Sequence, residues 1–205
     1  MNLSKLFEMQ RKLDERIIEE KGLHGQDLLD KKILALQVEL GELAQNWRGF
    51  KFWSNDQEPR IVEYRDCPYC GGHGVIDCFP FGAPDETHAY EEQCPECVGG
   101  QVEYNPLLEE YVDCLHFILS IGLEKGYDKY PLNSVFENHI RQENITQQFI
   151  GLIASSPSVT SYAGYLLTLQ LFIGLGEMLG FTWEEVEQAY LQKNAENHRR
   201  QKVGY

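Results

Sequence analysis

The stretch that decides the fold is ILALQVELGELAQNW, residues 33–47. Its residues Leu36, Leu40 and Leu43 recur every three or four positions, as on the buried face of an α-helix. Glu39 and Glu42 stand three residues apart inside this pattern, which places both carboxylates on one helical face, about one turn apart. The stretch therefore predicts a helix over residues 27–47 that carries an acidic pair beside an apolar stripe.

A second acidic pair repeats this arrangement later in the chain. Glu110 and Asp113 lie three residues apart in a predicted helix over residues 106–123, which begins at a favourable first-turn proline. Carboxylates near an apolar core are costly unless they are paired or bind a cation. Four carboxylates facing one another across two helices would form an oxygen-ligand site for Mg²⁺, with Mn²⁺ as an alternative. The competing interpretation is an ordinary solvated helix face.

The other apolar repeats predict an all-α protein. Helices are expected over residues 3–20, 132–153, 162–179 and 183–200, with a loop at residues 155–158 and Thr182 capping the last helix. Residues 162–179 are apolar nearly all round, which is typical of a central helix or of one at a subunit interface. Helical periodicity disappears in residues 55–104. The expected architecture is therefore a helical bundle with an insertion between its second and third helices.

Four cysteines of the insertion form two Cys-x-x-Cys turns. They are Cys67, Cys70, Cys94 and Cys97, and glycines follow each pair closely. Two converging turns of this kind supply four thiolates in the tetrahedral arrangement that structural Zn²⁺ prefers. A redox-active or disulfide-bonded pair is the alternative. Cys78 and Cys114 have no partner by spacing and are expected to be simple thiols.

Composition narrows the function classes. The 205 residues include 32 acidic and 18 basic side chains, which gives a formal net charge of −14. So acidic a surface repels phosphate backbones, and we therefore expect no nucleic-acid partner. If the substrate is an anion, a metal ion is expected to neutralise it. The first residues are mixed and charged, and no apolar run reaches about 18 residues, so neither a signal peptide nor a membrane span is expected. Six cysteines without a leader favour a reducing compartment, and the predicted location is cytoplasmic.

A basic face is predicted near the C-terminal end. Lys193, Asn197 and Arg200 follow one another at spacings of four and three, which places them on one side of the last helix. Lysine and arginine there would hold phosphate oxygens, with Asn197 as a neutral donor. The alternative is a solvated basic helix end that complements the helix dipole. Lys51 is a further phosphate candidate.

Together these motifs resemble a known family. In chain order they are Glu39-Leu-Gly-Glu42, Trp47-Arg-Gly-Phe-Lys51-Phe-Trp53-Ser54, Glu110-Tyr-Val-Asp113-Cys-Leu-His116-Phe117 and the stretch from Tyr190 to Tyr205. The chain is similar in these parts to the dimeric all-α dUTPases, members of the all-α nucleoside-triphosphate pyrophosphatase superfamily that also holds MazG-type enzymes. The likeness covers residues 1–54 and 105–205, which it implies to be the catalytic domain. Residues 55–104 depart from the family as a cysteine-rich, zinc-binding insertion.

The resemblance implies an activity. Members of the family cleave dUTP between its α- and β-phosphates to give dUMP and pyrophosphate, which limits the incorporation of uracil into DNA. It also implies that Glu39, Glu42, Glu110 and Asp113 are catalytic ligands of Mg²⁺ on the triphosphate, that one of the first pair orients the attacking water, and that the protein is a homodimer. Action on dUDP is a further expectation.

The same resemblance implies which residues read the base. Gln10 corresponds to a glutamine that contacts uracil, and an amide can both donate to and accept from a uracil edge. Asp14 follows one turn later, where the family has an asparagine. Trp53 is expected to stack on the base, and His116 to lie at the uracil end of the pocket. Taken alone, Gln10 and Asp14 are an ordinary exposed helix face, and Trp53 and His116 are core residues.

Two other functions stay open. Base specificity rests on few residues, so one alternative is a pyrophosphatase for another nucleotide such as dCTP or a modified nucleoside triphosphate. The other is a non-enzymatic zinc-containing interaction protein whose helices form a dimerisation scaffold. The substitution Glu39→Gln distinguishes them, because only an enzyme loses turnover.

Overall fold

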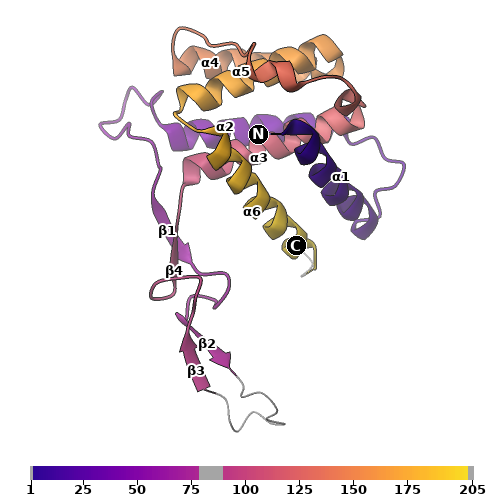
Figure 1. Ribbon diagram of the computed structural model, residues 1–205. Coiled ribbons are helices and arrows are strands. Elements are labelled where there is room, and N and C mark those ends of the chain that lie inside the picture. Colours follow the sequence, from indigo (N-terminus) through magenta and orange to yellow (C-terminus); the bar gives the residue numbers. More distant parts are fainter. Residues whose placement is uncertain (1, 79–89, 203–205) are drawn as a thin grey trace. The chain divides into compact units, whose positions relative to one another are not determined.

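The computed structural model describes residues 2–78 and 90–202 and divides the chain into two compact units (Figure 1). Unit 1 comprises Met1–Pro59 and Leu107–Tyr205, and unit 2 comprises Arg60–Pro106. The helices belong to unit 1 and the strands to unit 2. The predicted all-α fold with a small insertion is confirmed.

Six α-helices form the described part of unit 1. They are α1 Leu3–Glu20, α2 Leu29–Trp47, α3 Pro106–Glu124, α4 Ile145–Ser155, α5 Tyr162–Met178 and α6 Trp183–Lys202. Three short 3-10 helices connect them, η2 Tyr127–Lys129, η3 Asn133–Phe136 and η4 Ser156–Thr160. The predicted loop at residues 155–158 is instead the last residue of α4 followed by η4.

The predicted cap of the last helix is confirmed. The Thr182 hydroxyl oxygen accepts from the Glu185 backbone N–H (3.2 Å), and Glu185 Oε2 accepts from the Thr182 backbone N–H (2.9 Å). This reciprocal arrangement is a capping box, which satisfies backbone donors that the first helical turn leaves free. The direction in which α6 leaves the preceding turn is therefore set locally.

Helices α3 and α5 pack closely at the centre of the core. The Tyr111 hydroxyl of α3 donates to the Phe172 carbonyl oxygen (3.0 Å), and the Tyr165 hydroxyl of α5 donates to the Ile118 carbonyl oxygen (3.1 Å). Each tyrosine hydroxyl lies over a glycine of the opposite helix, Gly176 under Tyr111 and Gly122 under Tyr165. A Cβ at either glycine would collide with the hydroxyl, so this close approach requires glycine.

The apolar segment 162–179 is a central helix. Residues of α5 are buried along most of its length, within one copy of the chain. Its composition is therefore explained without a partner subunit.

In the described residues no single helix is long and apolar enough to cross a membrane. Helices α5 and α6 reach the required length and composition only when they are taken together, and this pair is bent by 109°.

The predicted continuous helix over residues 132–153 is wrong. Residues 137–144 lie between η3 and α4 and are irregular. The side chain of Gln148 holds them: its Oε1 accepts from the Gln142 backbone N–H (2.7 Å), and its Nε2 donates to the Ile140 carbonyl oxygen (2.8 Å). Side-chain hydrogen bonds to the backbone compete with helical ones, and here they outweigh the apolar repeat.

Unit 2 consists of two antiparallel strand pairs. Strand β1 Glu63–Asp66 pairs with β4 Gln101–Tyr104, and β2 Val75–Cys78 pairs with β3 Tyr90–Gln93. Its buried cluster contains Cys67, Cys70 and Cys94, with Ile76, Cys97 and Val102 packed against them. So small an apolar cluster is insufficient to stabilise a fold, and domains of this size usually need a metal or cross-links.

Candidate active site

Three carboxylates converge between α2 and α3. Glu39 and Glu42 come from successive turns of α2 and Glu110 comes from α3, and one oxygen of each lies within 4.8 Å of the others. Asn46 Nδ2 donates to Glu110 Oε1 (3.4 Å). Glu39 and Glu110 are partly buried, whereas Glu42 is exposed. Three of the four predicted metal ligands therefore meet at one place that is open on one side.

The environment of this cluster opposes ionisation. Burial raises the pKa of Glu39 to about 7, and the charges of Asp113 and Glu42 add to the effect. Burial likewise raises the pKa of Glu110 to about 7, again with help from Asp113 and Glu42. Carboxylates in this situation gain from a shared cation, and ligands made only of carboxylate oxygens suit Mg²⁺ or Mn²⁺. The residues present thus fit the predicted metal.

The fourth predicted ligand, Asp113, pairs with α6. Its Oδ2 lies 2.7 Å from Lys193 Nζ, which also lies 2.8 Å from Glu109 Oε1. Burial raises the pKa of Asp113, and the charge of Lys193 opposes this rise. Lys193 therefore holds a positive charge at the edge of the carboxylate cluster and links α6 to α3.

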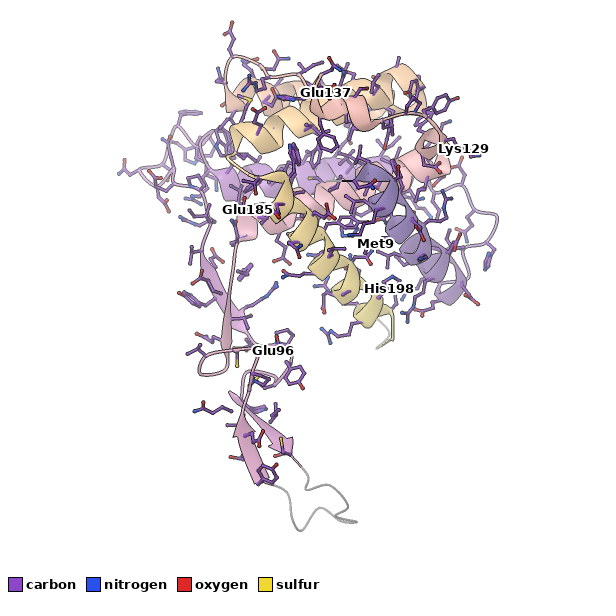
Figure 2. The ribbon with its side chains drawn as sticks, viewed as in Figure 1. Met9, Glu96, Lys129, Glu137, Glu185 and His198 are labelled. Carbon is purple, nitrogen blue, oxygen red and sulfur yellow. The ribbon has the colours of Figure 1, made fainter. Side chains whose placement is uncertain are left out.

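The rest of the predicted basic face occupies the end of α6. Arg200 Nε donates to Glu196 Oε1 (3.1 Å), and Asn197 is partly buried on the same helix. Figure 2 labels His198 on these last turns, and its Nδ1 lies 3.5 Å from Arg16 Nη1 of α1. The final turns of α6 are thus polar and lie against α1.

A buried polar network joins α1, α3 and α6. Gln10 Nε2 donates to Asp14 Oδ1 (2.7 Å), and Gln10 Oε1 accepts from the Tyr190 hydroxyl (2.9 Å) and lies 2.7 Å from His116 Nδ1. The Ser120 hydroxyl donates to Asp14 Oδ2 (2.6 Å). The His116 and Tyr190 rings stack with centroids 4.2 Å apart. Burial lowers the pKa of His116 to about 3, so its ring is neutral at pH 7.

Lys51 and Trp53 lie on the turn that follows α2. Trp53 is 66% exposed and makes edge contacts with the rings of Phe50 and Phe52. Lys51 Nζ lies 5.8 Å from the centre of the Phe50 ring. The structure places these two candidates at the surface rather than in the carboxylate cluster or the polar network.

The four clustered cysteines of unit 2 have the spacing of a metal site. The Sγ atoms of Cys67 and Cys94 lie 3.9 Å apart, those of Cys70 and Cys97 lie 3.7 Å apart, and all four fall within 4.8 Å of one another. With Zn–S bonds of about 2.3 Å, a tetrahedral site has edges of about 3.8 Å. All four thiols are free, as are Cys78 and Cys114, which lie outside this cluster. The arrangement is compatible with structural Zn²⁺.

Comparison with known families identifies the helical part. A family model described as dUTPase matches residues 2–67 and 99–205, which include the three convergent carboxylates, Lys193 and the polar network. The chain belongs to the dUTPase family. A search of curated proteins and a search of solved structures found no match.

As a dUTPase, the chain is an enzyme, a dUTP diphosphatase with a nucleotide substrate. Membership of the family argues against the alternative of a non-enzymatic scaffold. The matched ranges leave out residues 68–98, which carry three of the four clustered cysteines. The cysteine site is thus largely a feature of this dUTPase beyond the family match.

Two residues of the polar network, Ser120 and Tyr190, were missed in the sequence. Tyr190 and Asn194 are buried and stand four residues apart on α6, in line with buried Val186. The sequence does hold a signal for them, because polar side chains stand at positions of α6 that its apolar spacing assigns to the core. A polar side chain that is buried in this way needs a hydrogen-bond partner. The sequence pattern favours Asn197, three residues further on, because it shares a face with Lys193 and Arg200.

Proposed function

We propose that this dUTPase is Mg²⁺-dependent and hydrolyses dUTP to dUMP and pyrophosphate, and dUDP to dUMP and phosphate, limiting uracil incorporation into DNA. The observation that carries the proposal is the convergence of Glu39, Glu42 and Glu110 within 4.8 Å. Phosphoryl transfer requires mainly positioning and neutralisation of charge, and carboxylates fixed on two packed helices would position the cation that neutralises the phosphates.

The carboxylates would hold the ion, with Asp113 one turn along α3 as the fourth predicted ligand. Mg²⁺ bound there supplies charge neutralisation on the phosphates and polarises the bond to be broken. A carboxylate oxygen of Glu39 or Glu42 is suited to accept a hydrogen bond from the attacking water and orient it in line. The two helices supply the rigidity, because α3 is fixed in the core by Tyr111.

The α6 face would bind the outer phosphates. Lys193 is 13% exposed and already lies beside the carboxylate cluster, so its ammonium can approach a phosphate oxygen with little reorganisation. Arg200 and Asn197 continue this face toward the C-terminus. At the other end of the substrate, Gln10, Asp14 and His116 form the uracil side of the pocket, and Trp53 is a stacking candidate on the turn after α2.

The base preference separates this proposal from its runner-up. Pyrophosphate release should be measured with each canonical ribo- and deoxynucleoside triphosphate in the presence of Mg²⁺. We expect kcat/KM for dUTP to exceed that for dCTP by about 10²-fold, because a site built to pair polar edges rejects mismatched ones strongly. A preference for dCTP or a modified nucleotide would instead support a different pyrophosphatase specificity.

The raised pKa values predict an unusual pH dependence of stability. Between about pH 4.5 and 7, Glu39 and Glu110 keep protons in the folded state that they have lost in the unfolded chain. The free energy of unfolding of the metal-free protein therefore falls as pH rises through this window. Mg²⁺ binds the ionised form, so it should raise Tm by several degrees at pH 8 and much less at pH 5.5.

Thermal melting with EDTA and with Mg²⁺ at both pH values checks this expectation. The double variant Glu39→Gln/Glu110→Gln serves as the reference, because other groups also titrate in this range. It should lose most of the Mg²⁺ effect at pH 8. Equal stabilisation by Mg²⁺ at the two pH values, or in the two proteins, would contradict the assignment.

Two further features belong to the proposal. Zn²⁺ bound by the four cysteines has a structural role in unit 2.

The second feature is that the chain is a homodimer. The supporting observation is an exposed apolar surface, formed by Leu34 and Val38 on α2 and by Ile150 and Ile153 on the neighbouring α4. Light scattering at micromolar concentration tests this, and a monomeric mass would exclude the dimer.

A further inference from the structure

Lys193 pairs with two carboxylates at once. Its Nζ lies 2.7 Å from Asp113 Oδ2 and donates to Glu109 Oε1 at 2.8 Å. Within the described residues these two acids are its ion-pair partners, and only 13% of the Lys193 side chain is exposed. Glu109 and Asp113 stand four residues apart on α3, which places both on one face of that helix. One ammonium is therefore shared by acids from successive turns.

Asp113 also acts on the carboxylate cluster of Glu39, Glu42 and Glu110. Burial, followed by the charge of Asp113, raises the pKa of Glu39 and of Glu110 to about 7. Asp113 thus interacts with the cluster and with Lys193 at the same time. A carboxylate that shares its charge with a divalent ion attracts an ammonium less strongly, and the ion itself repels the ammonium. An ion in the cluster therefore weakens the hold of Asp113 on Lys193.

Glu109 is placed to keep the ammonium when this happens. It lies in the first turn of α3, where the positive end of the helix dipole favours a negative charge. Among the described residues it does not belong to the three carboxylates that converge within 4.8 Å. Its hydrogen bond with Lys193 is short and charge-assisted, so it can hold the ammonium without help from Asp113.

The position of the ammonium depends on these acids. Burial opposes the charged form of Lys193, but the charges and hydrogen bonds of Asp113 and Glu109 outweigh it and raise the pKa of Lys193. A lysine side chain has many rotamers, so an ammonium that loses its partners turns toward solvent. Once Asp113 is engaged by an ion, Glu109 is the acid that keeps Lys193 beside the cluster.

We propose that Glu109 is a positioning residue, which keeps the Lys193 ammonium beside the carboxylate cluster when Asp113 turns to the metal ion, so that the ammonium meets the outer phosphates of the substrate. This rests on the proposed function and adds to it a residue that acts through Lys193. An acid that merely adds charge beside an anion site weakens anion binding. An acid that positions the ammonium strengthens it, so the two roles predict opposite effects when Glu109 is removed.

Binding of inorganic pyrophosphate tests this role without turnover. Calorimetric titration of the full-length chain in the presence of Mg²⁺ gives the Kd of the wild type and of Glu109→Ala. We expect Glu109→Ala to raise this Kd by about tenfold, because the charge-assisted contact that holds the ammonium is lost. A Kd for Glu109→Ala that equals the wild-type value or falls below it overturns the inference.

The matched control removes another ion pair between helices. Glu187 of α6 lies 3.0 Å from Lys5 Nζ of α1, so Glu187→Ala also deletes a glutamate that pairs with a lysine of another helix. Neither residue belongs to the proposed site, and the Kd for pyrophosphate should equal that of the wild type. A tenfold rise in this variant as well would show that the loss of any such ion pair weakens binding, and would overturn the inference.

A double-mutant cycle shows whether Glu109 acts through Lys193. Lys193→Met removes the ammonium and keeps most of the side-chain length, so Glu109 then has no ammonium to position. In this background we expect Glu109→Ala to change the pyrophosphate Kd by less than about twofold. Effects of the same size in the two backgrounds would overturn the inference. The same dependence on Lys193 should appear in KM for dUTP, which should rise more than kcat falls.

The outcomes separate this inference from the proposed function. A wild-type protein that releases pyrophosphate from no nucleotide refutes the function. A wild type that hydrolyses dUTP, with pyrophosphate binding unaffected in Glu109→Ala, refutes the positioning role alone. If Glu109→Ala does not fold, Glu109→Gln takes its place, because it keeps the side-chain length and an acceptor oxygen but loses the charge. Its Kd should rise by about threefold, and an unchanged Kd would contradict the role.

Discussion

Glu39→Gln is expected to lower kcat for dUTP hydrolysis by about 10³-fold while leaving the protein folded. The substitution keeps the size of the side chain but removes one of three negative charges that converge within 4.8 Å. Charge stabilisation at a phosphoryl-transfer site is the main source of rate, so its loss appears chiefly in kcat. Pyrophosphate release with saturating Mg²⁺ and dUTP measures the effect.

Stability should change in the opposite direction to activity. Because burial and its acidic neighbours raise the pKa of Glu39 to about 7, its ionised form destabilises the metal-free fold above that pH. The Tm of metal-free Glu39→Gln should thus equal or exceed that of the wild type at pH 8. Asp30→Asn, an exposed acid-to-amide change on the first turn of α2, is the control and should leave turnover intact. Substantial turnover in Glu39→Gln would contradict the proposed site.

Loss of zinc is expected to unfold unit 2 and spare unit 1. The buried cluster of unit 2 consists mainly of the cysteines themselves, so a bound metal replaces the apolar core that it lacks. Binding free energies of structural Zn²⁺ reach about 10–16 kcal/mol in small domains, more than enough to determine whether such a unit folds. In the double variant Cys67→Ser/Cys97→Ser, the backbone amide hydrogens of β1 and β4 should lose their protection against exchange.

Metal analysis and circular dichroism complete this test. The purified protein should contain about one zinc per chain and the double variant none, while the helical signal of unit 1 persists because its core is separate. Cys78→Ser, outside the cysteine cluster, is the matched control and should keep its zinc. A zinc-free wild type with protected strands would exclude the metal site.

Local patterns predicted most of the helices and both cysteine turns. The convergence of Glu39, Glu42 and Glu110 could be expected from the sequence, because the first two depend only on helical spacing and the third on the packing of two apolar stripes. The helix predicted over residues 132–153 failed because Gln148, which itself lies in that stretch, satisfies the irregular backbone through its side chain. No apolar repeat encodes that competition.

The polar network was less predictable for a different reason. Gln10 and Asp14 are one helical turn apart, so their contact follows from spacing, but their further partners lie on α3 and α6. Which of the two Gln10 amide atoms faces His116 depends on the assembled fold. The Asp113–Lys193 pair likewise joins helices that are far apart in the sequence.

The glycine contacts between α3 and α5 have a mechanical consequence. Since each tyrosine hydroxyl lies directly over a glycine of the other helix and donates to a carbonyl oxygen there, α3 and α5 are fastened to each other at two points. Glu110 is therefore carried by a helix that is fastened to the core at two places that follow it in sequence, Tyr111 and the Ile118 carbonyl oxygen. The contact of α6 with α3 is of another kind, because Lys193 pairs with Glu109 and Asp113, and an ammonium can exchange one negatively charged oxygen for another.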